Sequence, residues 1–302
     1  MKKLILFSIF TIAFSTANAQ QDSTAVEQSN IQNYTPSKLL EKGKWDIKWF
    51  NNLYTQTEGE YNGLKTDVPR SNFFTTSLEV FTGITNSKKV NVGLILEYRS
   101  NSFAGESATS VFSFNNEVGK SRSGLSHFAP SVKIAPFNGL PRFSIQSSFF
   151  IPVFDKETNE NGYLAQNSYI WQNRFFYDYT FPGKKFQLFS EIGTRLFFGE
   201  KSVNADNTFN ENGGFANNSL EVAPGVFLSY FPTNKFTILG FVQHAQLVDL
   251  GNDFEQNYTA VGFGAKYQLT KVLNLETLYS KFVRGNDSGL GQSFNLGLRA
   301  IF

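Results

Sequence analysis

Residues 169–198 read YIWQNRFFYDYTFPGKKFQLFSEIGTRLFF, and this stretch carries the clearest structural pattern in the chain. Aromatic and aliphatic side chains occupy every second position on both sides of a Pro-Gly-Lys-Lys break. A period of two places alternate side chains on opposite faces of a β-strand. The charged residues of the two arms, Arg174 and Asp178 before the break and Glu191 and Arg195 after it, occupy the face opposite to the apolar one. The stretch therefore predicts a β-hairpin with one apolar face and one charged face.

Each arm of this predicted hairpin is long enough to cross a bilayer, because a tilted β-strand needs only about 9–11 residues for the crossing. Similar alternating segments recur along the chain, and together with the two arms they number twelve. They begin near residues 45, 74, 90, 128, 143, 169, 186, 220, 236, 261, 273 and 294. In residues 236–248 the pattern leaves open which side chains share a face. Bacterial single-chain barrels have an even number of strands. We therefore predict an all-β fold, a transmembrane antiparallel up-and-down β-barrel of about 12 strands over residues 44–302.

The connections between the predicted strands alternate in length, which also favours a barrel in the outer membrane. The short connections are residues 85–89, 138–142, 182–185, 232–235 and 270–271. The long connections are roughly residues 55–71, 100–123, 155–167, 200–217, 249–256 and 284–291. Short periplasmic turns and long extracellular loops are the expected asymmetry of such barrels. The long connections are rich in Asn, Gly, Ser and acidic residues, so we expect them to be solvated.

Three of the short turns share a pattern of aromatic residue, turn residues, base and aromatic residue. They are FNGLPRF at 137–143, FPGKKF at 181–186 and FPTNKF at 231–236. Aromatic side chains favour the membrane interface, and bases can meet lipid headgroups. The pattern indicates a periplasmic aromatic girdle, although Pro and Gly also make these turns consistent with ordinary hairpins.

The N-terminus has the three parts of a secretory signal peptide. Lys2 and Lys3 precede an apolar run at residues 4–14, and Ala17-Asn-Ala19 forms a cleavage site. We predict a cleaved signal peptide at residues 1–19. Residues 20–43 are polar and predict a flexible periplasmic N-terminal segment. The alternative for this segment is a short plug in the lumen.

The composition limits the remaining function classes. The 302 residues include 34 Phe and 12 Tyr, which suits either a lipid-facing surface or the core of a soluble sandwich. There is no cysteine, so disulfides, thiolate metal sites and a lipid-modified N-terminal cysteine are excluded. The net charge of +2 is too small to indicate nucleic-acid binding.

The last predicted strand, QSFNLGLRAIF at residues 292–302, resembles the C-terminal assembly signal of outer-membrane barrels. The matching positions are Asn295, Gly297, Ala300 and Phe302, although Ala300 is smaller than the usual hydrophobic residue. This resemblance implies recognition by the barrel-assembly machinery.

Residues 258–302 also resemble the tail of transporter-type barrels grouped with the phenol-degradation MetA-pathway proteins. The shared features are GFGAKY at 262–267, a Thr-Lys turn, Tyr279 and SFNLG at 293–297. The resemblance covers about 45 residues and implies a transport role for the barrel.

The chain offers little for catalysis or metal binding. Its two histidines, His127 and His244, lie outside any HExxH or HxxxH pattern. The loop acids Asp249, Asp253 and Glu255 do not have the spacing of an EF-hand loop. We therefore expect no cofactor, no metal site and no enzymatic activity.

The charged residues of the strands are predicted to face the lumen, since a lipid-facing Lys or Arg at mid-depth costs about 2–4 kcal/mol. They are Asp46, Lys48, Glu79, Glu97, Arg99, Lys133, Arg174, Asp178, Glu191, Arg195, Glu221, Lys266, Glu276 and Arg299. The candidates for a constriction are Glu97, Arg99, Arg174, Asp178, Glu191, Arg195 and Arg299.

Three functions remain open at this point. Twelve strands lie between the filled eight-stranded barrel and the open porin of sixteen to eighteen. The first hypothesis is a channel or facilitator for small solutes that diffuse through a mixed-charge lumen. The second is a non-conducting surface or structural barrel whose long extracellular loops bind a partner, with Phe103 and Phe112 as anchors. The third is a rim hydrolase that uses His127 or His244.

We expect the cell outer membrane as the location of the protein. The expected partners are outer-membrane lipid, the barrel-assembly machinery and small solutes, without nucleic acid.

Overall fold

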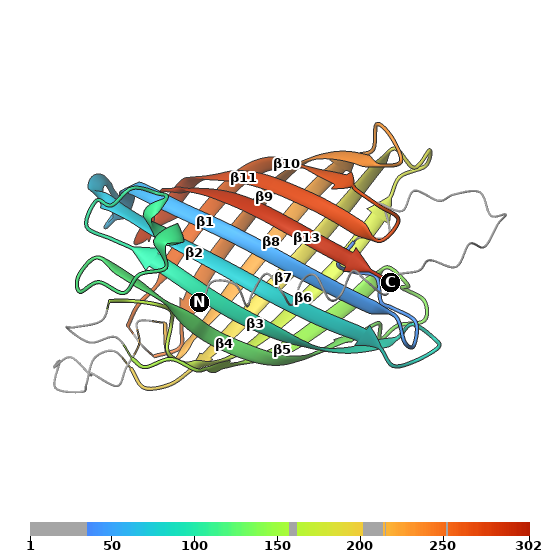
Figure 1. Cartoon of the computed structure of the whole chain (residues 1–302), viewed down its shortest axis with the longest axis horizontal. Helices are drawn as coiled ribbons and strands as arrows, with labels where there is room; N and C mark the ends of the chain where they lie inside the picture. Colours follow the sequence, from blue (N-terminus) through green and yellow to red (C-terminus); the bar gives the residue numbers. More distant parts are fainter. Residues whose placement is uncertain (1–34, 157–161, 202–213, 215, 252) are drawn as a thin grey trace.

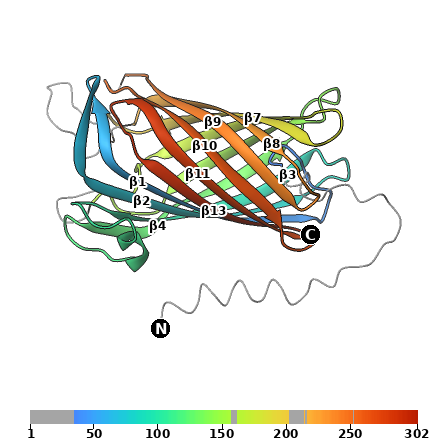
Figure 2. The same ribbon diagram turned by 90° about the horizontal axis from the view of Figure 1, so that it is seen from above.

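The computed structural model describes residues 35–156, 162–201, 214, 216–251 and 253–302, and it shows a closed antiparallel β-barrel (Figure 1 and Figure 2). The signal peptide predicted at residues 1–19 lies outside the described residues. Twelve long strands form the wall, and the two-residue strand β12 (Ser288–Gly289) lies at one end. The long strands are β1 (Trp45–Tyr61), β2 (Leu64–Gly83), β3 (Val90–Ser102), β4 (Ser121–Ile134), β5 (Phe143–Pro152), β6 (Tyr169–Thr180), β7 (Phe186–Phe198), β8 (Ser219–Tyr230), β9 (Phe236–Asp249), β10 (Gln256–Gln268), β11 (Leu273–Asn286) and β13 (Gln292–Ile301).

Each long strand pairs with its neighbour in sequence, and β1 closes the barrel by pairing with both β2 and β13. At this seam Lys48 lies opposite Glu79 on β2 and opposite Arg299 on β13. Closure leaves no sheet edge exposed to the hydrocarbon, where unpaired backbone groups would be costly. All twelve predicted strands are present, so the predicted fold class is confirmed.

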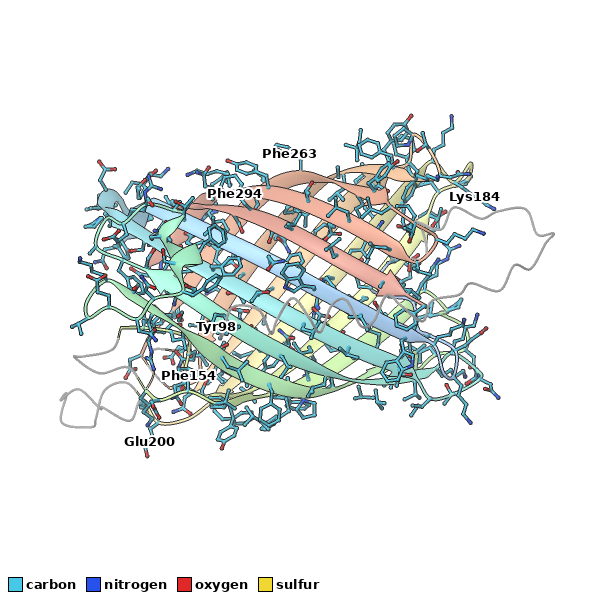
Figure 3. The ribbon with its side chains drawn as sticks, in the orientation of Figure 1. Tyr98, Phe154, Lys184, Glu200, Phe263 and Phe294 are labelled. Atoms are coloured by element: carbon cyan, nitrogen blue, oxygen red, sulfur yellow. The ribbon has the colours of Figure 1, made fainter. Side chains whose placement is uncertain are left out.

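The two faces of the wall differ as the alternation predicts. On the hairpin of β6 and β7, Trp171 and Ile192 are 46% and 49% exposed on the outside. Phe176 and Asp178, which have the opposite parity, are 0% and 3% exposed inside the barrel. Phe263 lies on the outer wall in Figure 3 and is 64% exposed. This outer apolar surface suits contact with lipid tails.

The structure also settles the side-chain directions in β9, which the sequence left open. Ile238 and Val242 are exposed on the outer wall, whereas Leu239 and Phe241 are buried inside. The alternation is regular, but both faces are apolar. The sequence pattern separates an apolar face from a polar one, so it could not show which of these two apolar faces points outward.

Two predicted long loops are wrong. In residues 55–71 the strands β1 and β2 continue to a two-residue turn at Asn62 and Gly63, which have φ angles of 51° and 75°. Two positive φ values in an Asn-Gly pair are typical of the tight turn that matches strand twist. In residues 284–291 the chain likewise stays extended, as β11 and β12, and β12 pairs with β1 at Gly59 and Glu60. Both segments are polar, so the sequence pattern predicts loops, but their backbones pair as strands and extend the barrel wall.

The remaining long connections all lie at one end of the barrel, and the short turns lie at the other, beside the C-terminus (Figure 1). We call these the loop end and the turn end. The connection after β3 contains a short 3-10 helix, η2 (Ser110–Ser113). Within the described residues, no helix is long and apolar enough to cross a membrane.

Residues 35–44 lie at the turn end, where they are bonded to the barrel wall. Ser37 is 2% exposed and donates a hydrogen bond to Asp178. The backbone N–H of Leu40 donates to Asn91 Oδ1 at 3.2 Å. The described part of the segment predicted as a flexible tail, residues 35–43, therefore forms hydrogen bonds with the barrel wall, and whether it acts as a tail or a plug stays a prediction. Residues 20–34 lie outside the described residues.

Candidate functional site: the barrel lumen

Twelve of the fourteen charged residues predicted to face the lumen form six ion pairs there. The pairs, with their closest N–O distances, are Lys48–Glu79 (3.9 Å), Arg99–Glu97 (2.8 Å), Arg174–Glu191 (2.7 Å), Arg195–Glu221 (3.7 Å), Lys266–Glu276 (2.5 Å) and Arg299–Asp46 (2.6 Å). Five pairs join neighbouring strands, and the sixth joins two positions of β3. A buried charge is tolerated when it is paired and hydrogen-bonded. The pairing leaves the lumen polar without a large net charge.

The two remaining charged residues contact the N-terminal segment instead. Lys133 Nζ donates to the backbone carbonyl of Pro36 at 3.0 Å and lies over the rings of Phe81 and Phe176. Asp178 accepts hydrogen bonds from Ser37 and from Gln187 Nε2. Through these two contacts, residues 36 and 37 lie among the charged side chains of the lumen near the turn end. We call Lys133 and Asp178, together with Asp46, Lys48, Glu79, Arg174 and Arg299, the ring.

This ring leaves very little space. A cavity of about 30 Å³ lies between Pro36 and the surrounding charged side chains, which is room for little more than one or two water molecules. Its lining is Pro36, Asp46, Lys48, Glu79, Phe81, Lys133, Gln146, Arg174 and Arg299. Two predicted constriction residues, Arg174 and Arg299, are therefore found at the narrow part. Lys133 and Pro36, which were not among those candidates, line it as well.

A larger cavity of about 610 Å³ adjoins the ring, and side chains from nine of the twelve long strands line it. Glu191 belongs to this cavity, as do the Lys48–Glu79 and Lys266–Glu276 pairs. Its other wall is aromatic. One run of rings is Phe189, Phe227 and Phe241, with centroids 5.6 and 5.1 Å apart, and Phe176 stacks on Phe189 outside the cavity lining at 6.0 Å. A second run is Tyr54, Phe282 and Tyr258, with spacings of 4.8 and 4.4 Å.

The aromatic wall was missed by the sequence prediction, although a signal for it exists. Phe189 alternates in phase with Gln187 and Glu191, so it shares the polar face of its strand. Glycines opposite the rings give them room. A Cβ on Gly262 would lie 2.2 Å from Phe241 Cζ, so the ring of Phe241 has room there only because residue 262 has no side chain.

At the loop end, the connection between β5 and β6 folds against inward-facing side chains. Asn101 Nδ2 donates to the carbonyls of Tyr163 and Leu164 at 2.9 and 2.8 Å. Arg122 donates to the carbonyls of Asp155 and Gly162 at 2.7 and 2.8 Å. The described part of this connection is thus bonded to side chains of β3 and β4 at the loop end.

Two of the predicted constriction residues, Glu97 and Arg99, lie nearer the loop end and do not line the small cavity of the ring. Glu97 Oε1 accepts from Arg99 Nε at 2.8 Å and from Ser126 Oγ at 2.9 Å. His127 is buried, with Nδ1 3.4 Å from the same oxygen. Because the Ser126 hydroxyl binds Glu97 and not His127, these residues do not form a nucleophile–base pair. Among the described residues, no group of three or more His, Cys, Asp or Glu side chains is arranged to hold a metal.

His244 and the loop aromatics are engaged in local contacts. His244 Nδ1 lies 2.9 Å from Thr259 Oγ1 on the neighbouring strand. Phe112 packs edge-on against Phe74 at 5.1 Å, and Phe103 packs against a ring of β2 at 5.7 Å. These contacts give the rim-hydrolase hypothesis no support, and both proposed loop anchors already pack within the protein.

The predicted C-terminal signal residues have defined places on β13 and beyond it. Asn295 accepts a hydrogen bond from Asn52 Nδ2 at 2.7 Å inside the barrel. Gly297 lies under the ring of Phe50. Phe302 exchanges two backbone hydrogen bonds with Trp45, at 2.8 and 3.0 Å, so the chain terminus completes the seam.

No protein-family model and no curated protein matches this chain. Solved structures do match it. An outer membrane channel from Pseudomonas putida F1 has a TM-score of 0.64 and 11% identity, covering 92% of this chain and 100% of that one. The β domain of the Bordetella autotransporter BrkA has a TM-score of 0.53 and 12% identity, covering 86% and 99%. At these identities the likeness concerns the fold. The chain therefore has the fold of a bacterial outer-membrane β-barrel.

Proposed function

We propose that this protein is an outer-membrane channel or facilitator through which small solutes diffuse. The observation that supports this most is the cavity of about 610 Å³ inside a closed barrel, lined by polar, charged and aromatic side chains. A barrel whose interior served only to hold its shape would be expected to fill this volume, because protein interiors are close-packed. The solved structure from Pseudomonas putida F1, which has the same fold, is an outer membrane channel, and this is in keeping with the proposal.

In the proposed mechanism, the paired charges select solutes by size and polarity more than by sign of charge. Arg174 binds Glu191 through two hydrogen bonds, at 2.7 and 3.2 Å, so neither charge projects a strong field along the path. A solute would pass the ring by replacing contacts with its hydration water by contacts with the charged side chains of the ring. The aromatic wall would contact its apolar surface.

Passage also requires residues 35–37 to move, because Pro36 lies in the narrow ring. These residues are held by a few hydrogen bonds and not by a strand ladder, so displacing them leaves the barrel closed by its own pairing. The N-terminal segment thus acts as a removable plug at the turn end.

The test is single-channel recording in planar bilayers, with solute flux into liposomes as a second readout. Deletion of residues 35–41 removes the plug and should raise the conductance several-fold over the wild type. Lys42→Gln/Lys44→Gln is the matched control, because these exposed residues of the same segment line neither cavity. Absence of channel events and of flux in both the wild type and the deletion variant would reject the proposal.

The alternative is a non-conducting barrel whose long loops bind a partner. Phe112 is 48% exposed even though it packs on the barrel, so one face of its ring is available for such contact. A folded protein that never conducts, but loses a surface partner when η2 and its flanking loop are deleted, would favour this function.

We also propose that the C-terminal strand directs assembly of the barrel in the outer membrane. Asn295, Gly297, Ala300 and Phe302 match the assembly signal, and the terminal residue lies at the turn end beside β1. The barrel-assembly machinery would be the partner in this step.

A further inference from the structure

The two ends of the barrel carry opposite charge. The turns at 84–89, 135–142, 181–185, 231–235 and 269–272, together with residues 35–44, contain ten basic residues and a single acid, Glu41. The described residues of the connections at the loop end contain seven acids and three bases, counted over 103–120, 153–156, 162–168, 199–201, 214, 216–218, 250–251, 253–255 and 287–291. The turn end is therefore strongly positive, although the whole chain has a net charge of only +2.

The bases of the turn end recur at one structural position. A base immediately precedes each of β1, β3, β5, β7 and β9, and Lys271 comes two residues before β11. We call this set the basic collar. It consists of Lys44, Lys89, Arg142, Lys185, Lys235 and Lys271. Every second strand of the wall thus begins with a base, so that neighbouring collar residues are separated by two strand spacings, about 10 Å.

Backbone hydrogen bonds fix the collar in place around the rim. The carbonyls of Lys89, Lys185 and Lys235 accept from N–H groups of the next connection or strand, at 2.9, 2.8 and 2.8 Å. The carbonyls of Lys44 and Arg142 accept in the same way at 3.1 and 3.3 Å. The bases are therefore anchored at a common level by the barrel and do not sit on long flexible loops.

Aromatic side chains accompany the collar. In four of the six strands the first residue is aromatic, and two of these, Trp45 and Phe186, are 41% and 45% exposed on the outer wall. Aromatic rings favour the level of the lipid headgroups, and long basic side chains reach from the apolar boundary toward the headgroup charges. The collar thus lies where the barrel wall leaves the membrane.

The one acid of the turn end does not neutralise the collar. Glu41 forms an ion pair at 2.6 Å with Lys88, which is not a collar residue. A hydrogen bond from Lys88 also lowers the pKa of the Glu41 carboxyl, so the acid stays ionised in this pair. Lys89 contacts the neutral amide of Asn138, and Arg142 lies over the ring of Tyr179, so neither of these contacts pairs a collar base with an acid.

We propose that the basic collar binds anionic phospholipid headgroups of the leaflet that surrounds the turn end. An ammonium or guanidinium group donates hydrogen bonds to a phosphate diester, and the attraction is strongest for lipids without a compensating cationic headgroup. Phosphatidylglycerol fits this description better than phosphatidylcholine. The inference does not depend on whether the lumen conducts.

The test uses tryptophan fluorescence, with Trp49→Phe/Trp171→Phe as background so that Trp45 of the rim is the only reporter. The protein is placed in phosphatidylcholine vesicles that contain a fixed fraction of either brominated phosphatidylglycerol or brominated phosphatidylcholine. Brominated phosphatidylglycerol should bind beside Trp45 with an affinity roughly threefold or more higher, and the preference should shrink at high salt.

Lys44→Gln/Lys89→Gln/Lys271→Gln removes the collar bases nearest Trp45 and should abolish the preference. Lys65→Gln/Lys156→Gln/Lys201→Gln removes the same number of charges from the loop end and should retain it. Retained heat-modifiable mobility on gels shows that each variant is folded. Equal quenching by the two lipids in the background protein, an unchanged preference in the collar variant, or equal loss in both variants would overturn the proposal.

Discussion

At the residue scale, the lumen shows how a charged side chain can be predicted to lie inside a barrel without its role being known. Lys133 was placed in the lumen by parity alone, with thirteen other charged residues. The structure shows that Lys133 binds the described part of the N-terminal segment, through Pro36, while it lies over two phenylalanine rings. Its partner is 97 positions away in sequence, so no local pattern could indicate this contact.

The Arg174–Glu191 pair gives a prediction about ion selectivity. Glu191→Gln leaves the Arg174 guanidinium without its carboxylate, so the lumen gains a positive charge and the reversal potential in a salt gradient should move toward anion selectivity. The unpaired arginine should also lower the free energy of unfolding by about 1–3 kcal/mol.

Arg174→Gln/Glu191→Gln removes both charges and should return the selectivity to that of the wild type, as expected for two coupled residues. Glu117→Gln, an exposed change at the loop end, is the control and should leave the reversal potential unchanged. Equal reversal potentials in the wild type and Glu191→Gln would show that this pair does not face the ion path.

Gly262 gives a prediction about packing of the aromatic wall. Gly262→Val places a Cβ where the ring of Phe241 lies, at 2.2 Å, and should lower the free energy of unfolding by about 1–3 kcal/mol. Gly240→Val is the matched control on the neighbouring strand, because the nearest atom to its Cβ is 3.9 Å away. Urea unfolding in vesicles measures both, and similar midpoints for the two variants would contradict the packing argument.

At the scale of elements, strands were predictable where their two faces differ in chemistry. The hairpin of β6 and β7 has an aromatic outer face and a charged inner face, and its observed limits lie within one residue of the sequence pattern. β9 was ambiguous because its inner face carries Leu239 and Phe241. The extension of β1 and β2 to the Asn62–Gly63 turn was missed because that part of the hairpin has polar residues on both faces.

The last strand gives a prediction about assembly. Phe302→Ala should reduce the amount of folded protein in the outer membrane, because it removes the terminal aromatic residue of the proposed signal. The purified variant should still fold in detergent, since the backbone bonds between Phe302 and Trp45 do not need the ring. Phe294→Ala, a change of a similarly exposed phenylalanine on β13, is the control. The heat-modifiable fraction on gels measures assembly, and equal fractions in both variants would exclude a special role of the terminal ring.

At the scale of the whole molecule, the connection lengths, the opposite charges of the two ends and the position of residues 35–44 define a direction along the barrel axis. The short turns, the C-terminus and residues 35–44 lie together at one end. The expected orientation has this end in the periplasm, where a plug on an exported chain would enter the barrel.

The absence of cysteine allows a direct test of this orientation. Val118→Cys lies in the loop after η2 and is 68% exposed, so an impermeant maleimide should label it in intact cells. Gly139→Cys lies in a short turn with no atom near its Cβ, and it should be labelled only after the outer membrane is permeabilised. The reverse pattern of labelling would invert the assignment of the two ends.

The sequence by itself determined the class of fold, the number of strands and the inward direction of the charged residues. It could do so because lipid on one side of a strand and water or protein on the other impose a period of two on every crossing. Only the tertiary structure decided which charges pair, how the aromatic wall forms and where residues 35–44 lie. These depend on contacts between segments far apart in the chain, and closure of the barrel brings those segments to the same level of the lumen.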